Sequence, residues 1–561
     1  MIINVEKGRN PVRVADFFCG GGGFSEGFRQ AGYEIVFAVD KWKPAITTYK
    51  GNKPGVNVIK DDVIRISQLC DEEFEKLVPD SEVIIGSPPC QSFSHSNKSG
   101  NADKTLGIQL IEAYLRIVAR KKFKQNSILR YWVLENVPSV QEHIKDKYSA
   151  YDLGLRGDFV LYTKGKTSGV YNAKYFGAPT NRKRYLCGDF PPLVQTKTDK
   201  TVVTLKAVLD FLGDPMDKNE GVIIDANYPD LRLRRDEVTD HHYIYKLAPF
   251  EVETARRLKQ DKGYMGSMAF PENINKPSRT IMATMSTSSR EAMILGYSKG
   301  YRLPTVRETA SMMGFPIDYR FFGKTKATKH TLVGNAVPPP MSYAVAKAIA
   351  LDAGVTIPKH YIPISYDNNV EFYDLNWKTF PTKKEKAKRD VAKFKYHIPY
   401  LIYDAYRVEL TNYHSDFDNK KFKWDAEIHY SQGKARAKVF LPVFLEDTIS
   451  PKYRKKVCNY IKNMCTCLGT YNEFQQAFCM TEDKRKSLNL FGPYELLAHV
   501  KNFITSILTE EEMRQNVDIS CQPQQLPQAI VIGYYILNQL VVYMGGLQNG
   551  CSNQKSKINR N

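Results

Sequence analysis

A cysteine that follows two prolines is the strongest candidate for chemistry in this sequence. The run SEVIIG at residues 81–86 is short and apolar, which predicts a buried strand, and SPPCQSFS continues it. The prolines stiffen the loop and fix the direction in which Cys90 points. A thiol at the top of a sheet can have a lowered pKa and act as a nucleophile, whereas most cysteines are buried and inert. The prolines and the strand-end position favour the nucleophile.

A carboxylate ends a second apolar run. Residues 128–137 read ILRYWVLENV, and Pro138 follows them. Because the carboxyl ends of parallel strands meet in one crevice, we expect Glu135 to face the same crevice as Cys90. A buried glutamate there could stay protonated or share a proton with a heterocycle. Taken alone, Glu135 could equally cap a helix or form a salt bridge.

A glycine-rich turn, DFFCGGGGF at residues 16–24, joins a predicted strand to a predicted helix. Glycines allow a ligand to approach the backbone closely, although such a turn could bind a dinucleotide or simply be tight. The third glycine of the dinucleotide pattern is replaced by Ser25, which favours a smaller adenosine ligand. Asp40 ends the next strand and could bind ribose hydroxyls, and Asp62 could receive an adenine amino group.

Strands alternate with helices in the first third of the chain, which predicts an α/β fold with a doubly wound, mostly parallel sheet. The alternation is lost after Pro191 and helical periodicity returns beyond Gly300. We therefore expect a catalytic domain, a smaller mixed domain, a return of the chain to the catalytic domain and a C-terminal extension. Their predicted ranges are 1–190, 191–300, 301–355 and 356–561.

Six motifs in this order together resemble the cytosine-5 DNA methyltransferase family, over roughly residues 12–352. They are DFFCGGGGF, PPCQSFS, ENV, TNRKR at 180–184, RLPTVRETASMMGFP at 302–316 and HTLVGNAVPPP at 330–340. The arginine motif of the family usually opens with glutamine, where this chain has Thr180. Asp40 stands where the family usually has glutamate, and it keeps the charge on a shorter arm.

The resemblance implies a Rossmann-like core that uses S-adenosylmethionine to methylate cytosine C5. It assigns Cys90 to addition at C6, Glu135 to the N3 and N4 edge of the base, and Arg184 to the base O2 and to the positioning of Glu135. Arg182 would brace the loop. In duplex DNA the target base must be flipped out of the stack. The residues implied in cofactor binding are Phe18, Gly20, Gly22, Asp40, Asp62, Asn335 and Val337; Asn335 alone could be a simple turn residue.

The family places its variable recognition domain in the region that here covers about residues 191–300. The segment KPSRTIMATMSTSSRE at 276–291 contains side chains that can read base edges or contact phosphate. We expect base readers among Arg279, Thr280, Thr284, Ser288 and Arg290.

The charge balance fits a polyanionic partner. The chain has 80 lysines and arginines against 60 aspartates and glutamates, a formal net charge of +20. Ten scattered cysteines show no disulfide framework, and the apolar run at 529–544 is too short for a membrane span and predicts a buried helix. We expect a monomeric, cytoplasmic, prokaryotic enzyme on duplex DNA, without a resident metal or a membrane, and a cognate restriction endonuclease as partner.

Three hypotheses compete for the region beyond residue 358. A DNA-binding or regulatory extension is the default, preceded by the basic stretch TKKEKAKRDVAKFK at 382–395. A fused nuclease could use Asp425 and Glu427, although no Glu-x-Lys follows on that strand. A zinc site could use Cys458, Cys465, Cys467 and Cys479, whose spacing is irregular.

Three rival functions remain for the whole chain. A tRNA cytosine-5 methyltransferase could share the core, but the large 191–300 region favours duplex DNA. A non-catalytic DNA-binding relative is disfavoured by the intact motifs. A Rossmann oxidoreductase is disfavoured by the missing third glycine and by the PPCQ segment.

Overall fold

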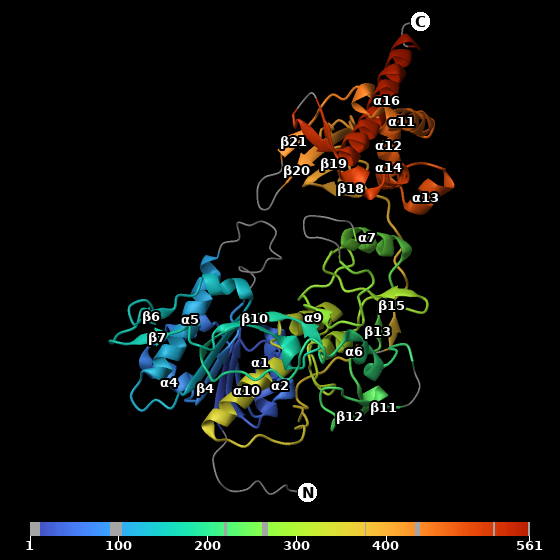
Figure 1. Cartoon of the computed structure of the whole chain (residues 1–561). Coiled ribbons are helices and arrows are strands. Elements are labelled where there is room, and N and C mark those ends of the chain that lie inside the picture. The colour runs from blue at the N-terminus through green and yellow to red at the C-terminus, as the bar shows by residue number, and fades with distance from the viewer. Residues whose placement is uncertain are drawn as a thin grey trace. The chain divides into compact units, whose positions relative to one another are not determined.

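The computed structural model describes residues 12–89, 104–217, 221–260, 268–375, 377–431, 438–519 and 522–558, with side chains as far as residue 548. The chain forms two compact units (Figure 1). The first unit comprises Met1–Leu247 and Pro271–Thr382, and the second comprises Ala248–Phe270 and Lys383–Asn561. Each unit is described by itself below.

The first unit is built on a seven-stranded sheet with the order β3-β2-β1-β4-β5-β10-β8. The strands β1 to β5 are parallel, and β10 is antiparallel to both of its neighbours. Their bounds are β1 Arg13–Phe17, β2 Glu34–Asp40, β3 Asn57–Lys60, β4 Val83–Gly86, β5 Tyr131–Asn136, β8 Gly169–Asn172 and β10 Lys183–Asp189. The predicted α/β class with a mostly parallel sheet is confirmed.

Helices cover both faces of this sheet because successive strand residues point to opposite sides. In β1, Val14 joins one buried cluster and Phe17 joins the other. The first cluster includes α1 (Gly23–Gln30) and α10 (Pro339–Ala353), and the second includes α3 (Val63–Ser67), α4 (Asp71–Leu77) and α5 (Thr105–Lys122). A Cβ atom on Gly27 would lie 2.3 Å from the backbone nitrogen of Tyr343, so this glycine lets α1 and α10 pack closely.

The rest of the first unit consists of short elements without a continuous sheet. Residues 191–247 and 271–302 contribute two-stranded pieces and one helix, in keeping with the mixed region expected there. The bounds of the remaining elements are α2 Lys43–Asn52, β6 Lys147–Ser149, β7 Val160–Tyr162, β9 Thr180–Asn181, α6 Leu205–Leu212, β11 Val222–Ile224, β12 Arg232–Arg234, β13 Tyr243–Ile244, β14 Ser278–Arg279, β15 Leu295–Tyr297, β16 Gly300–Arg302, α8 Val306–Met312, α9 Lys326–Asn335 and β17 Lys378–Thr379.

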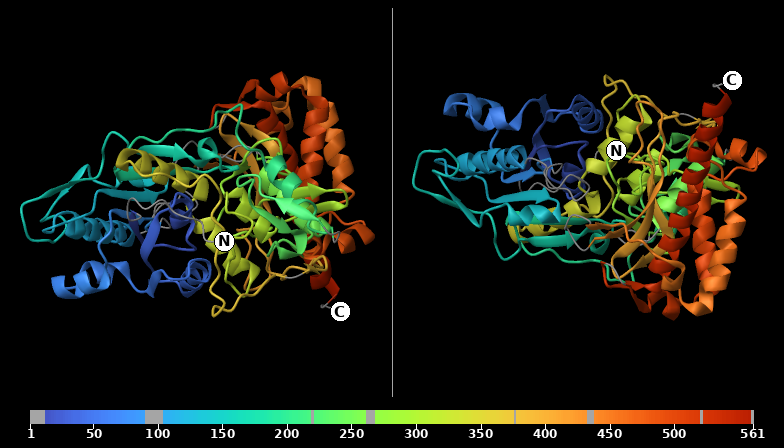
Figure 2. Two further views of the ribbon diagram at one scale, coloured as in Figure 1. Left: turned by 90° about the horizontal axis from the view of Figure 1, so that it is seen from below. Right: turned by 90° about the horizontal axis from the view of Figure 1, so that it is seen from above.

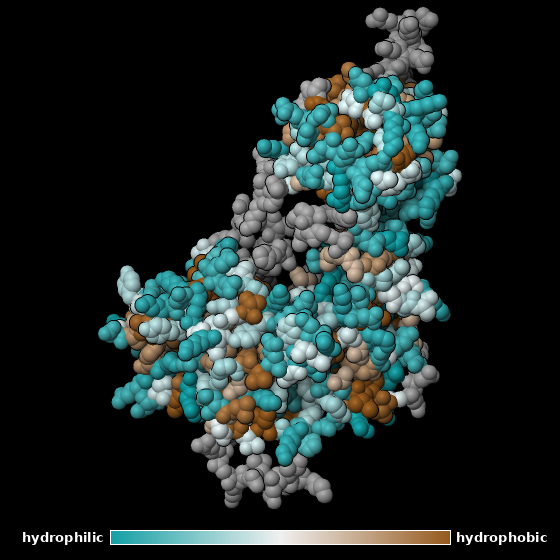
Figure 3. Space-filling view, viewed as in Figure 1, coloured by the Kyte–Doolittle hydropathy of each residue, from teal (hydrophilic) through white to brown (hydrophobic). Residues whose placement is uncertain are grey.

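The second unit is an antiparallel sheet, β18-β19-β20-β21, packed against helices. The long helix α16 runs beside the other helices of this unit, as the right view of Figure 2 shows. Hydrophilic residues cover much of the visible face of this unit in Figure 3. The bounds are α7 Pro249–Gln260, β18 Lys395–Tyr403, β19 Tyr406–Thr411, β20 Asp425–Tyr430, β21 Lys438–Phe440, α11 Pro451–Cys465, α12 Tyr471–Cys479, α13 Glu482–Ser487, α14 Pro493–Ile507, α15 Glu510–Arg514, β22 Asn516–Asp518, β23 Gln525–Pro527 and α16 Gln528–Ile558.

The apolar run near residue 529 forms the core of this unit. The stretch Gln528–Gln548 is long and apolar enough to cross a membrane, but 61% of its most apolar window is buried inside the protein. Ile530, Ile536 and Leu540 are fully buried in the same cluster as the inner face of the sheet. The predicted buried helix is confirmed, whereas the expectation that the run is too short for a membrane span was wrong, because the helix extends beyond residues 529–544 on both sides.

The helix α7 was expected within the smaller domain, yet its residues belong to the second unit. Residues 356–382, expected in the extension, lie in the first unit. That the four predicted ranges have separate functions stays a prediction.

Candidate active site

The glycine-rich turn links β1 to α1 through left-handed backbone conformations. Phe18 has φ 56°, Gly20 φ 51° and Gly22 φ 85°. A non-glycine residue held in this region is uncommon and often marks a functional site. A Cβ atom on Gly20 would meet no atom within 4 Å, so this side of the turn is open. A Cβ atom on Gly23 would lie 2.4 Å from the carbonyl oxygen of Val337, so the last motif packs directly against the turn.

Two aspartates hold the loops at the ends of β2 and β3. Asp40 accepts hydrogen bonds from the backbone nitrogens of Gly20 at 2.9 Å and Trp42 at 2.8 Å. Asp62 caps α3 by accepting from the backbone nitrogen of Ile64 at 2.9 Å. The ammonium group of Lys41 lies 2.8 Å from Asp62 and lowers the pKa of that carboxyl group. Both carboxylates therefore stand at the carboxyl edge of the parallel sheet, where ligands of such folds bind.

Glu135 forms a buried charged contact at this edge. It is only 4% exposed, and its carboxylate lies 2.8 Å from Nε of Arg184. The hydroxyl of Ser87 donates a hydrogen bond of 2.6 Å to the other carboxylate oxygen. The amide of Asn136 donates to the carbonyl oxygen of Pro88 at 3.0 Å. The segment that leads to Cys90 is thereby tied to the end of β5.

Cys90 itself lies outside the described residues, and its role stays a prediction. Ser87 and Asn136 were not singled out from the sequence as site residues. Their signal was present, because Ser87 opens the SPPC segment and Asn136 is the centre of ENV.

The two arginines of the TNRKR segment are both buried but have different partners. Arg184 contacts Glu135, as the resemblance implied. Arg182 is 2% exposed and donates to the carbonyl oxygens of Ile281 at 3.0 Å, Gly334 at 2.9 Å and Ala336 at 3.0 Å. It therefore braces loops, joining the segment near residue 281 to the last motif.

Comparison with known proteins decides the family. A family model described as C-5 cytosine-specific DNA methylase matches residues 12–351. The chain belongs to this family. The predicted recognition and the predicted enzyme class, a DNA cytosine-5 methyltransferase, are confirmed. The matched range ends before residue 383, so the C-terminal part of the second unit lies outside it.

Curated relatives match the same part of the chain. A putative type II methyltransferase of Methanocaldococcus jannaschii is 30% identical over 350 residues, covering 60% of this chain and 99% of that protein. A type II methyltransferase of Neisseria gonorrhoeae is 27% identical over 350 residues, covering 61% and 96%. The solved structure of a putative DNA modification methyltransferase from an E. coli prophage is 22% identical, with a TM-score of 0.41, covering 61% and 99%.

The expected base readers of this methylase lie in and after β14, which pairs with β9 beside the arginine motif. Arg279 is held by Glu272 at 2.8 Å, by Glu291 at 3.6 Å and by the carbonyl oxygen of Ala292. Thr280 donates to the carbonyl oxygen of Asn181 at 3.1 Å.

The other three expected base readers differ in their exposure. Thr284 and Ser288 are exposed, and Arg290 is half-buried. For Arg279 to read a base, it would have to exchange its carboxylate partners. The base-reading roles of all five residues stay predictions.

Of the predicted residues at the last motif, Val337 is buried against the glycine turn, whereas Asn335 is exposed at the end of α9. Only Val337 of the two is thus brought against the glycine turn in the structure. The cofactor roles of both stay predictions.

A buried ionic cluster beneath the glycine turn was missed at the sequence level. Glu26 is fully buried and lies 2.7 Å from Arg29 and 3.2 Å from Lys53. Burial alone would raise the pKa of Glu26, but the charges of Arg29 and Lys53 lower it to about 2. Lys53 also donates to the hydroxyl of Tyr319 at 3.0 Å, and that hydroxyl donates to the carbonyl oxygen of Gly21 at 2.5 Å. The cluster therefore supports the turn from below.

The competing hypotheses for the C-terminal region can be placed in the second unit. The four cysteines of the zinc hypothesis are all described, and they do not form a group that could hold a metal. Among the described residues, a group of side chains that could hold a metal ion is formed by Glu409, Glu427 and His429, on the adjacent strands β19 and β20.

These three side chains already contact cations or one another. Lys395 lies 3.1 Å from Glu427, Arg407 lies 2.6 Å from Glu409, and His429 lies 2.7 Å from Glu427. Asp425 pairs with His414 at 2.9 Å and with Lys423 at 3.2 Å. The carboxylates of the nuclease hypothesis are therefore charge-compensated in the structure.

Proposed function

We propose that this methylase transfers a methyl group from S-adenosylmethionine to C5 of a flipped cytosine within a short sequence of duplex DNA, through a covalent adduct with Cys90. The observation that carries the proposal is the contact of Glu135 with both Arg184 and Ser87, at the end of β5 and beside the SPPC segment. A buried carboxylate fixed by two donors is suited to hold one edge of a base in a defined orientation.

The proposed chemistry divides among three side chains. The thiolate of Cys90 adds to C6 of the base, which makes C5 electron-rich. Glu135 holds the N3 and N4 edge and stabilises the adduct as N3 gains a proton, and Arg184 fixes Glu135 and contacts O2. S-adenosylmethionine supplies the methyl group when bound. Loss of the C5 proton and of the Cys90 thiolate then restores the ring. Flipping the base out of duplex DNA costs a few kcal/mol.

The residues at the carboxyl edge fit an adenosine-containing cofactor. Gly20 is open on its Cβ side, and Phe18 and Gly22 give the turn its left-handed course. Asp40 and Asp62 stand at the ends of the next two strands, where they would hold ribose and adenine. Asn335 and Val337 would close the methionine end.

The biological role that we propose is modification within a restriction–modification system, in a prokaryotic cytoplasm and as a monomer. The relatives from Methanocaldococcus jannaschii and Neisseria gonorrhoeae are both named type II methyltransferases, which supports this role. A cognate endonuclease that cuts the same sequence would be the partner.

The test uses labelled S-adenosylmethionine and mixed-sequence duplex DNA, followed by conversion sequencing to map 5-methylcytosine. We expect methylation at one short motif by the wild-type protein and none by Cys90→Ser. Cys70→Ser is the matched control, since Cys70 is an exposed cysteine of the same unit. Label in tRNA but not in duplex DNA, or equal label from the Cys90→Ser protein, would overturn the proposal.

A further inference from the structure

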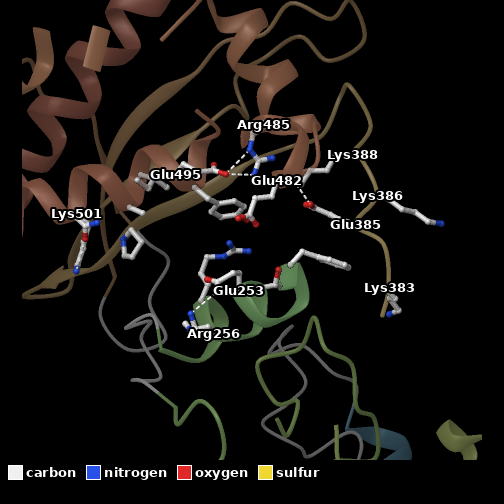
Figure 4. A pocket seen from close by; sticks show the side chains of 18 of the residues that line it. Glu253, Arg256, Lys383, Glu385, Lys386, Lys388, Glu482, Arg485, Glu495 and Lys501 are labelled. Carbon is white, nitrogen blue, oxygen red and sulfur yellow. Dashed lines mark hydrogen bonds and ion pairs between the residues drawn. The ribbon is translucent and has the colours of Figure 1, made fainter. Parts of the chain in front are cut away.

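The second unit contains a cavity of about 1020 Å³ whose lining comes from segments far apart in the sequence (Figure 4). One wall is α7, and others are the segment 383–388, the beginning of α13 and the face of α14. All the lining residues belong to this unit. The segment 383–388 lies within the basic stretch that the sequence places before the extension.

The lining is strongly basic. It has eight basic side chains against four acidic ones, an excess of four positive charges. The basic residues are Arg256, Arg257, Lys383, Lys384, Lys386, Lys388, Arg485 and Lys501, and the acidic ones are Glu253, Glu385, Glu482 and Glu495.

The acidic side chains of the lining are already engaged. Glu253 pairs with Arg256 at 2.9 Å, and Glu495 pairs with Arg485 at 2.5 Å. Glu385 accepts a hydrogen bond of 2.8 Å from the backbone nitrogen of Glu482. The side chain of Glu482 in turn pairs with a lysine outside the lining, at 2.6 Å. Two of the four carboxylates are thus paired with arginines of the lining and one with a lysine outside it, and the lining keeps its excess of positive charge.

Several of those cations have no anionic partner among the described residues. Lys384 and Lys386 are exposed and make no ion pair or side-chain hydrogen bond there. The guanidinium group of Arg257 lies over the ring of Tyr494, 3.7 Å from its centre, and Lys501 lies 5.9 Å from the ring centre of Tyr400. Stacking fixes the guanidinium plane and leaves its N–H groups available to an anion.

A run of exposed lysines on a convex surface is usually just solvated. Here the lysines of 384–386 and the arginines of α7 converge on one concave, partly aromatic surface, although about 130 residues separate them. Like charges gathered in a hollow raise the local potential and attract an anion. Phosphodiester groups are repeated single anions at regular spacing, and arginine and lysine side chains bind them on release of counterions.

We propose that this basic cavity of the second unit binds the phosphate backbone of duplex DNA, in addition to the DNA contacts of the proposed methyl-transfer residues of the first unit. The inference rests on the proposed action on duplex DNA. The second unit would then add DNA affinity that does not depend on base sequence. Lys384 and Lys386 contact phosphates directly, and Arg257 is the pre-oriented donor.

The test is fluorescence anisotropy of the full-length protein with a labelled duplex, at several salt concentrations. The variant is Lys384→Ala/Lys386→Ala, which removes two charges and no described contact. The matched control is Lys455→Ala/Lys456→Ala, which removes two exposed lysines of α11 in the same unit, outside the cavity. Lys384→Arg/Lys386→Arg keeps the charge.

We expect the cavity variant to weaken DNA binding roughly tenfold and to lower the slope of log Kd against log salt by about 2, equally for all sequences. The arginine variant should restore both quantities, and the α11 control should change neither by as much. Equal slopes for the cavity variant and the α11 control would overturn the inference, and would leave an acidic protein surface as the alternative anion.

Methyl transfer is measured in parallel, because the two proposals can fail separately. A wild-type protein that methylates duplex DNA while the cavity variant keeps the full salt slope contradicts only the cavity. A wild-type protein that loses affinity on cavity substitution but methylates no duplex contradicts only the proposed function.

Discussion

Carboxylates occur in both units, but in opposite settings. In the first unit Asp40, Asp62 and Glu135 stand at or just beyond the ends of parallel strands, each held by two neighbouring donors. In the second unit Glu409 and Glu427 face each other in the middle of antiparallel strands. A strand-end carboxylate faces the crevice where a ligand arrives, whereas a mid-strand one is surrounded by its own sheet. We expect the first arrangement to serve binding and chemistry, and the second to serve stability.

The largest expected effect is that of Glu135→Gln. Loss of the carboxylate should lower kcat for methyl transfer roughly 10²- to 10⁴-fold, because the base loses its proton-sharing partner. The free energy of unfolding should fall by roughly 1–3 kcal/mol, because Arg184 loses its buried charged partner while glutamine can still accept from Ser87. Single-turnover methylation and urea denaturation measure the two quantities. Glu142→Gln, at an exposed residue of the following turn, is the control. A large loss of stability with unchanged kcat would break the comparison.

Glu427→Gln should lower stability without lowering methyl transfer. The side chain is 4% exposed and contacts His429 at 2.7 Å and Lys395 at 3.1 Å. Its loss should destabilise the second unit by roughly 1–3 kcal/mol, because Lys395 and His429 lose their buried partner. Methyl transfer should stay within about twofold of wild type.

Urea denaturation followed with and without added Mn²⁺ measures the effect of Glu427→Gln. Glu511→Gln, at an exposed residue of α15, is the control. Mn²⁺-dependent cleavage of DNA by the wild-type protein that disappears in the Glu427→Gln protein would show the opposite role and revive the nuclease hypothesis.

Glu26→Gln should sharpen the comparison within the first unit, because this carboxylate is structural rather than ligand-facing. Its folded pKa of about 2 lies below the ordinary value of 4.5. The stabilising contribution is therefore complete above about pH 4.5 and is lost as the pH falls through about 2. The stability difference between the variant and wild type should be constant from pH 7 to pH 5 and should shrink below that. Thermal unfolding from pH 3 to pH 7 tests this, and a difference that grows on acidification would contradict it.

Asp40→Asn should have the smallest effect. We expect about a tenfold loss of affinity for S-adenosylmethionine, about 1.4 kcal/mol, because asparagine keeps one acceptor for the backbone donors but loses the charge. Isothermal titration calorimetry measures it. An unchanged affinity would mean that Asp40 only holds the Gly20 and Trp42 backbone.

The sequence predicts the first unit better than the second for a physical reason. Strand ends are read from local apolar runs, and Glu135, Asp40 and the glycine turn all lie directly after such runs. The Glu26–Lys53 pair and the Arg182 contacts depend on packing between elements, which no local spacing encodes. The nuclease hypothesis combined Asp425 with Glu427. In the sheet, the carboxylate directly opposite Glu427 is that of Glu409 on β19, and this register depends on the fold and not on local spacing.

The basic cavity of the second unit could not be predicted from local sequence either. The basic stretch is visible in the sequence, but its convergence with α7 is not, because α7 lies in the region expected to recognise DNA bases. The family pattern predicts that region between the arginine motif and RLPTVRE. It contains no signal that a 23-residue part of it, Ala248–Phe270, packs with the end of the chain.

The assignment of Ala248–Phe270 to the same unit as the end of the chain has a consequence for biosynthesis. The ribosome completes α7 well before the helix that carries Tyr494, the ring on which Arg257 stacks. At the usual rate of roughly 5–20 residues per second, α7 waits on the order of ten seconds or more for its partner. A protein shortened at Thr382 would leave α7 permanently without the strands and helices that cover it. A soluble first unit should therefore require removal of Ala248–Phe270 as well, with Leu247 joined to Pro271.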